Sequence, residues 1–175
     1  MPENTLPLPS TARPGASAAD ADAVWAVLTG MYEAYDAGDR ARIDQALDPR
    51  ATVWDSATDP LLLGKPDLDR IRDARPAAGE GPQETGLTAY DRTTDDFGDI
   101  AVLCYWLRVD FAPAPDGTPG RPELIRNTVI LHRAGETWRI PYARSATGTR
   151  DPPGSVSGHR TSGASGDGSE TRRRW

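Results

Sequence analysis

Hydrophobic side chains recur every three or four residues between positions 20 and 37, in the stretch DADAVWAVLTGMYEAYDA. The residues that form this stripe are Val24, Val27, Leu28, Met31 and Tyr35, and Trp25 and Tyr32 broaden it. A period of 3.6 residues is typical of a helix that buries one side against a core. The pattern therefore predicts an amphipathic helix over residues 20–37.

Two shorter helices and one strand are predicted next. Gly38 is a typical helix stop, and Asp39 can cap a second helix over residues 39–48. The run ATVWDS, residues 51–56, alternates like a strand. A proline can then open a third helix over residues 66–75, since its missing N–H costs nothing in a first turn.

The hydrophobic period changes to two in the second half of the chain. Four strands are predicted there, over residues 85–96, 100–112, 122–134 and 136–146. Turn sequences rich in Gly, Asp and Pro separate them, so the strands should pair as antiparallel neighbours. The order indicates an α+β domain, in which three N-terminal helices fold against the concave face of one curved antiparallel sheet. Such a cone would enclose a blind pocket.

Alternation along a strand assigns its side chains to the two faces of the sheet. The residues expected on one side of the last strand are Trp138, Ile140, Tyr142 and Arg144. Tyr105 and Trp106 are adjacent, so one should line the interior and the other should lie on the outer face. An aromatic side chain on the outer face is a reasonable contact for a second subunit.

Composition divides the chain into three parts. Residues 1–19 and 147–175 are rich in Gly, Ser, Pro and Ala or Arg and bury too little apolar surface to fold, so we expect disordered tails. Residues 20–146 are long enough for one core. The net charge of −6 argues against a nucleic-acid-binding surface. The terminal arginines, Arg172–Arg174, could contact an anionic partner or form a solvated end.

Several kinds of site and location find no support in the sequence. Cys104 is the single cysteine and is expected to pack as a small hydrophobic residue. The two histidines, His132 and His159, form no pair with metal-ligand spacing, and we expect neither a metal nor another cofactor. Because no secretory signal and no apolar run of membrane-spanning length occurs, a cytoplasmic protein without membrane contact is the expectation.

Four stretches in the same order resemble the nuclear-transport-factor-2-like superfamily, which includes ketosteroid isomerase and the SnoaL-like polyketide cyclases. They are MYEAYDAGDRARI (31–43), ATVWDSATDPLLLGKPDLDRI (51–71), IRNTVILHRAGETWRI (125–140) and YARS (142–145). The resemblance implies a cone-shaped fold and a homodimer formed through the outer sheet face. Many relatives end in His-x-His-Ser, where this chain has Tyr142 and Arg144. That departure makes a histidine-based mechanism improbable.

Asp55 is the first candidate for chemistry. It follows Trp54 at the end of the first strand, which in this fold lies near the pocket mouth. A carboxylate beside an aromatic wall would be desolvated, which would raise its pKa and suit it to act as a general base. The alternative is that Asp55 caps the following turn.

Tyrosines of the first helix and of the last strand are the second candidates. Tyr32 or Tyr142 could donate a hydrogen bond to a ligand oxygen, since a buried hydroxyl needs a partner. Ketosteroid isomerases use a tyrosine donor beside carboxylic acids in this way. Tyr35, which lies on the stripe, and Trp138 would line the pocket or pack in the core.

Arginines of the last two strands are the third candidates. Arg126 and Arg144 could meet a carboxylate of a ligand or of the protein, with Asp91 and Asp110 as internal partners besides Asp55. Epoxide hydrolases of the related fold use an Asp-Arg-Asp arrangement, whose residue types this chain contains. The alternative for each arginine is an ordinary ion pair.

These candidates support two hypotheses of different classes. The first is a cofactor-independent isomerase, cyclase or dehydratase acting on a small apolar or aromatic molecule, with Asp55 as base, Tyr32 as donor and Arg144 as stabiliser of an anion. The residues expected to bind the substrate are Trp54, Tyr35, Arg126, Tyr142 and Trp138. The second is a non-catalytic module for ligand binding or dimerisation, because fold alone does not settle function.

Overall fold

The computed structural model describes residues 14–55, 61–74 and 83–147. The predictions for the outer parts of the two tails, including His159 and the terminal arginines, lie outside these residues. The helices are α1 (Ala18–Asp36), α2 (Arg40–Ala46) and α3 (Gly64–Asp73). The strands are β1 (Leu47–Trp54), β2 (Leu62–Leu63), β3 (Glu84–Asp96), β4 (Ile100–Phe111), β5 (Glu123–Ala134) and β6 (Thr137–Thr147).

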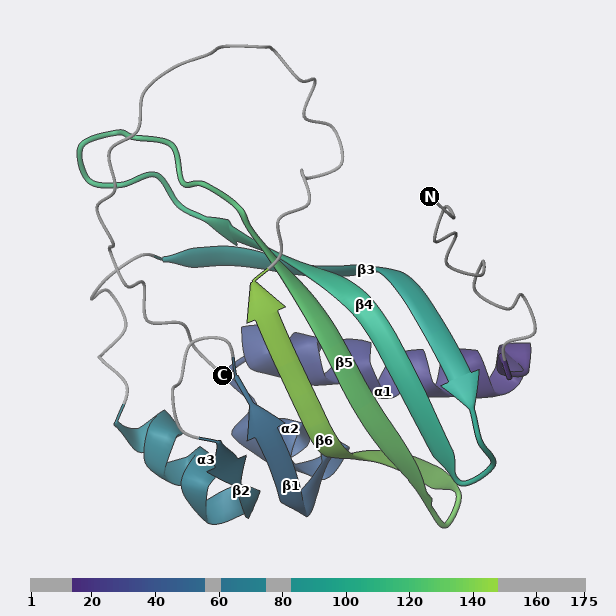
Figure 1. Ribbon diagram of the computed structural model, residues 1–175. Coiled ribbons are helices and arrows are strands. Elements are labelled where there is room, and N and C mark those ends of the chain that lie inside the picture. The colour runs from purple at the N-terminus through teal and green to yellow at the C-terminus, as the bar shows by residue number, and fades with distance from the viewer. Residues whose placement is uncertain (1–13, 56–60, 75–82, 148–175) are drawn as a thin grey trace, which may run out of the picture.

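The six strands form one sheet in the order β2-β1-β6-β5-β4-β3. The α+β prediction is confirmed, as is the curved sheet with its helices on one side (Figure 1). One detail differs, because β1 pairs with β6 in parallel and the sheet is therefore mixed. The sequence pattern could not show this, since the pair joins strands from opposite ends of the domain.

Helix α1 crosses the inner face of the sheet, and α2 and α3 lie near β1 (Figure 1). The buried residues Val24, Leu28 and Met31 of α1 pack in one cluster with Leu103 and Leu131 of the sheet. Each fully buried leucine contributes about 1.5–3 kcal/mol of stability relative to an exposed one. No helix in the described part of the chain is both long and apolar enough to cross a membrane.

Local signals in the sequence fix the helix ends near β1. Gly38 takes a positive φ of 68° after α1, and Asp39 caps α2 by accepting a hydrogen bond from the Arg42 N–H at 3.0 Å. Both features were predicted. Helix α3 begins earlier than predicted, at Gly64, whose φ is 71°. A Cβ at this position would lie 3.1 Å from the Pro49 carbonyl oxygen, so glycine allows α3 to approach the β1 backbone.

A bulge in β6 changes the side on which its residues point. Ile130 pairs with Tyr142 but His132 pairs with Arg139, so β6 has one extra residue beside Pro141. Proline cannot donate to the ladder and is tolerated at such an irregularity. The prediction that Tyr142 and Arg144 share a side with Trp138 and Ile140 is therefore wrong.

After the bulge, Ala143 and Ser145 continue the inner face. Tyr142 is half-buried and Arg144 is exposed. The adjacent pair on β4 divides as predicted, with Tyr105 buried on the inner side and Trp106 half-buried on the outer side. Cys104 also lies on the outer side and is exposed, so the prediction that it packs as a core residue is wrong.

Candidate functional site

A cavity of about 60 Å³ lies between the helices and the inner face of the sheet. This is room for roughly four to six water molecules, at 10–15 Å³ each. Most of its wall is apolar and comes from every layer of the fold, including Met31 of α1, Leu68 of α3, and Leu107 and Ile125 of the sheet. Such a cavity suits a small ligand with an apolar body and a few polar atoms.

Polar side chains cross this apolar face in a single row. Tyr105 of β4 pairs with Asn127 of β5, which pairs with Ser145 of β6. Trp54 at the end of β1 pairs with Arg144 of β6, in parallel. The residues that follow them in the chain are Asp55 and Ser145, so these two residues are neighbours in register. All four residues are buried, and we call them, together with Tyr32 of α1, the polar row.

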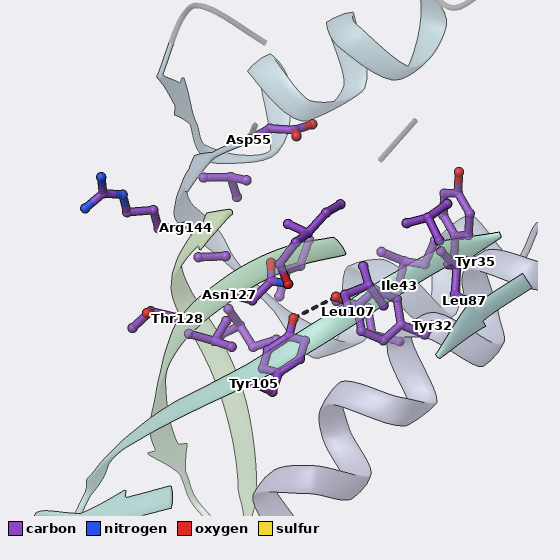
Figure 2. A pocket seen from close by; sticks show the side chains of 18 of the residues that line it. Tyr32, Tyr35, Ile43, Asp55, Leu87, Tyr105, Leu107, Asn127, Thr128 and Arg144 are labelled. Atoms are coloured by element: carbon purple, nitrogen blue, oxygen red, sulfur yellow. Dashed lines mark hydrogen bonds between the residues drawn. The ribbon is translucent and has the colours of Figure 1, made fainter. Parts of the chain in front are cut away.

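The central part of the polar row is held by hydrogen bonds between neighbouring strands. The Ser145 hydroxyl donates to the Asn127 Oδ1 at 2.8 Å. The Asn127 amide donates to the Ile125 carbonyl at 3.2 Å. These bonds fix the orientation of the Asn127 carboxamide, which lies in the middle of the site in Figure 2.

Tyr32 and Tyr105 share a hydrogen bond in which their hydroxyl oxygens lie 2.6 Å apart (Figure 2). Burial raises the pKa of Tyr32, while the bond with Tyr105 lowers that pKa and the nearby Asp55 carboxylate raises it. The pKa of Tyr105 is raised well above its ordinary value by burial and by Tyr32. Both phenols are therefore neutral at physiological pH and can donate hydrogen bonds.

Asp55 lies at the edge of the cavity with 3% of its surface exposed. In Figure 2 its carboxylate lies next to the neighbouring helix, above Asn127 in this view. Its negative charge contributes to the raised pKa of Tyr32. Two of the predicted catalytic residues, Asp55 and Tyr32, therefore line the same cavity.

A second polar group lines another part of the wall. The Tyr35 hydroxyl donates to Glu84 Oε2 at 2.8 Å, and both residues line the cavity. Arg72 of α3 also lines it. Of these three, the sequence reasoning had singled out only Tyr35.

Arg144 borders the cavity, but its exposed side chain points away from the other labelled residues (Figure 2). Its guanidinium carbon lies 5.7 Å from the centre of the Trp54 ring, and Trp54 itself is 49% exposed. Tyr142 and Arg126 lie on the same outer side. The structure therefore separates Arg144 from Asp55 and Tyr32.

The other candidates lie elsewhere in the fold. Trp138 is buried beneath the guanidinium of Arg133, 4.3 Å from ring centre to carbon, and does not line the cavity. Asp91 is exposed at an irregularity of β3, where its φ is 56°. Asp110 forms an ion pair with Arg108 at 2.8 Å. The Asp-Arg-Asp arrangement is not assembled around Asp55 by these residues.

Sequence reasoning missed Asn127 and Ser145 as members of the site. A strict two-residue period assigns Ser145 to the outer side, and only the bulge brings it opposite Asn127. Pro141 in the middle of an alternating strand was the available signal, since proline favours bulges and edges. No cluster of three or more His, Cys, Asp or Glu side chains suited to a metal ion occurs in the described segments.

Comparison with solved structures places the fold among known relatives. A CaMKII hub from S. rosetta is 21% identical, with a TM-score of 0.61 over 73% of this chain and 95% of that chain. A Streptomyces avermitilis protein proposed to be a dehydratase of the NTF2-like family is 17% identical, with a TM-score of 0.61 and coverage of 75% and 99%. A ketosteroid isomerase-like protein from Erwinia carotovora atroseptica is 10% identical, with a TM-score of 0.58 and coverage of 72% and 94%.

At these identities the likeness concerns the fold alone, and proteins with different roles share it. No curated protein sequence matches the chain. The family model of the SnoaL-like domain matches residues 24–145, which includes most of α1, all of α2 and α3, nearly all of the sheet and all of the polar row. This chain therefore belongs to the SnoaL-like domain family.

Proposed function

We propose that this chain is an enzyme that moves a proton on a small, largely apolar carbonyl compound bound in the cavity. Asp55 removes a proton from the carbon next to the carbonyl group. The Tyr32–Tyr105 pair donates a hydrogen bond to the carbonyl oxygen as negative charge develops there. The observation that supports the proposal is a buried carboxylate and a buried phenol pair in one apolar cavity.

Each part of this arrangement suits proton transfer. A positioned carboxylate contributes about 10²–10⁴-fold to the rate of such a step. Donors fixed before the reaction stabilise an enolate without reorganisation, and apolar walls strengthen their effect. Return of the proton from Asp55 to another carbon completes an isomerisation, whereas its transfer to a departing hydroxyl group on the adjacent carbon releases water and completes a dehydration. The proposal requires no cofactor.

The phenol pair takes the stabilising role that the sequence suggested for Arg144. Hydroxyls of Tyr32 and Tyr105 are buried in the site, whereas the Arg144 guanidinium lies over Trp54. A ligand oxygen close to Tyr32 would also lie near Asn127, whose carboxamide is already oriented by Ser145. Recognition of the substrate thus rests on the polar row rather than on the outer face.

The test is exchange of carbon-bound hydrogen with solvent. Phenylacetone, a small aromatic ketone, would be incubated with the protein in D₂O, and loss of its methylene proton signal followed by NMR. We expect exchange faster than the uncatalysed rate for wild type and about 10²–10⁴-fold slower catalysis for Asp55→Asn. Phenylacetone that binds the protein without accelerated exchange would contradict the proposal.

A second function, assembly through the outer sheet face, is favoured by a separate observation. That face presents Trp54, which is half-exposed, together with the exposed residues Cys104, Arg126 and Arg144. The S. rosetta hub shows that a domain of similar fold occurs in a protein named as a hub. We propose a homodimer in which this face is buried, either beside catalysis or in place of it.

Light scattering after gel filtration tests this second function. We expect a dimer for wild type and a monomer for Trp54→Asp, because a charge would be buried in the interface. Phe97→Asp is the matched control, since Phe97 is also a large exposed apolar residue but lies in the turn after β3. A monomeric wild type would contradict assembly and leave the catalytic proposal untouched.

A further inference from the structure

Arg72 is an unusual residue on the wall of an apolar cavity. It belongs to the last turn of α3 and its side chain is 9% exposed. Leu68, one turn earlier on the same helix, lines the cavity beside it. A buried guanidinium is costly unless acceptors surround it, so its partners show what the site needs.

In the described part of the chain, Arg72 contacts two carboxylates through Nη1. Nη1 donates to Asp44 Oδ1 at 2.6 Å and lies 3.6 Å from Asp69 Oδ1. Asp44 and Asp69 are also bridged by Lys65, at 2.7 and 2.8 Å. Asp44 therefore keeps a cationic partner even when Arg72 is absent, and the link between α2 and α3 does not depend on Arg72 alone.

Within residues 14–55, 61–74 and 83–147, the hydrogen bond and the ion pairs of Arg72 are made by Nη1. Nε and Nη2 carry three of the five N–H groups of a guanidinium. These N–H groups are available to water or to a ligand. Since Arg72 lines the cavity, an acceptor inside the cavity could satisfy them.

We infer that Arg72 binds the carboxylate of a ligand whose apolar body fills the cavity. The planar fork of a guanidinium matches the two oxygens of a carboxylate and forms short, charge-assisted hydrogen bonds with them. This inference rests on the proposed function only in that the cavity is a ligand site. Combined with the polar row, it specifies the substrate as a small apolar keto acid.

Glu84 opposes the ligand's charge and provides an internal check. It lines the same cavity, and the Tyr35 hydroxyl holds its Oε2. A bound carboxylate would be repelled by Glu84, so Glu84→Gln should strengthen its binding. The amide oxygen can still accept the hydrogen bond from Tyr35, which keeps the wall in place.

The test compares two probes of nearly equal size and shape, benzoate and benzamide, in NMR titrations of the full chain. We expect wild type to bind benzoate about tenfold more tightly than benzamide, corresponding to one charge-assisted hydrogen-bonded pair. Equal affinities for the two probes, or no saturable binding of benzoate at millimolar concentration, would overturn the inference. This comparison requires no variant.

Variants then assign the preference to Arg72. Arg72→Met keeps the apolar stem, and we expect it to lose the tenfold preference while its affinity for benzamide changes less than about twofold. Arg70→Met is the matched control, because Arg70 is on the same helix, is 61% exposed and pairs with Asp67. A preference for benzoate that survives Arg72→Met in folded protein would also overturn the inference.

Asp55→Asn separates this inference from the proposed function. We expect the variant to lose proton exchange but to keep the preference for benzoate, because Asp55 takes no part in binding the carboxylate. If wild type accelerates exchange but does not prefer benzoate over benzamide, only the inference about Arg72 fails. If wild type prefers benzoate but does not accelerate exchange, only the catalytic proposal fails.

Discussion

Ser145 donates its hydroxyl proton to the Asn127 carboxamide at 2.8 Å, across the β5–β6 pair and on the inner face of the sheet. This contact exists because β6 carries an extra residue at Pro141. With regular alternation from Trp138, the arginine at position 144 would point inward and Ser145 outward. One bulge thus decides whether the end of β6 presents a charge or a neutral hydrogen bond to the cavity.

Ser145→Ala should destabilise the protein by about 1–3 kcal/mol, because it leaves a buried Asn127 oxygen without its donor. Thr128→Ala is the control on the outer side of β5, where we expect a change of about 0.5 kcal/mol or less. Denaturation by urea measures both. Equal losses for the two variants would show that the Ser145 bond contributes nothing specific.

Gly64→Ala should cost about 1–2 kcal/mol, because φ at this position is 71° and left-handed backbone is unfavourable for residues with a Cβ. The added methyl group would also lie 3.1 Å from the Pro49 oxygen. Gly86→Ala provides the comparison, since no atom lies within 4 Å of a Cβ there. A neutral Gly64→Ala in thermal unfolding would mean that α3 does not depend on this close approach.

Alkaline titration should reveal the buried phenols. The pKa values of Tyr32 and Tyr105 are raised in the folded state above 10.0, their ordinary value. Their contribution to stability is therefore complete below pH 10 and is lost as the pH rises above it, since the unfolded chain then loses protons that the folded chain retains. Stability measured by urea denaturation should fall above pH 10.

Phenylalanine variants check the assignment. When the folded protein is titrated through pH 10, its absorbance rises as tyrosines become phenolates. Tyr32→Phe or Tyr105→Phe should leave the size of this rise unchanged, because neither phenol ionises near pH 10 in the folded state. A smaller absorbance change in either variant would show that the substituted tyrosine ionises normally.

Tyr32 and Tyr105 should act as one unit in catalysis. We expect each single Phe variant to slow phenylacetone exchange about 10²-fold, the usual cost of one preorganised donor. The double variant should be little slower than the worse single variant, because residues that act together are strongly non-additive. Rate losses that multiply in the double variant would indicate independent roles.

Much of the fold was predictable because its signals are local. Gly38 and Asp39 mark a helix end and a cap through their own backbone and side chain, and a two-residue period marks strands. The partner of β1 was not predictable, because parallel pairing with β6 depends on contacts between residues far apart in sequence. The face of the sheet on which Ser145 lies was predicted wrongly for a similar reason. One extra residue in a strand moves every side chain after it to the opposite face.

The candidate site was predictable in part. Asp55 and Tyr32 were identified from residue type and position, and both line the cavity. Arg72 gave no signal, because in sequence it is one of several arginines and aspartates on a charged helix. Its significance comes from burial against the cavity, which a single sequence does not display.

Rescue of an Asp55→Ala variant by formate tests the central claim most directly. The substitution leaves space where the carboxylate stood, and formate can enter it and act as the base, whereas formamide of similar size cannot. The account predicts that wild type accelerates deuterium exchange into phenylacetone, that Asp55→Ala does not, and that formate but not formamide restores exchange. Exchange by Asp55→Ala at the wild-type rate, or exchange by wild type no faster than in buffer, would contradict it.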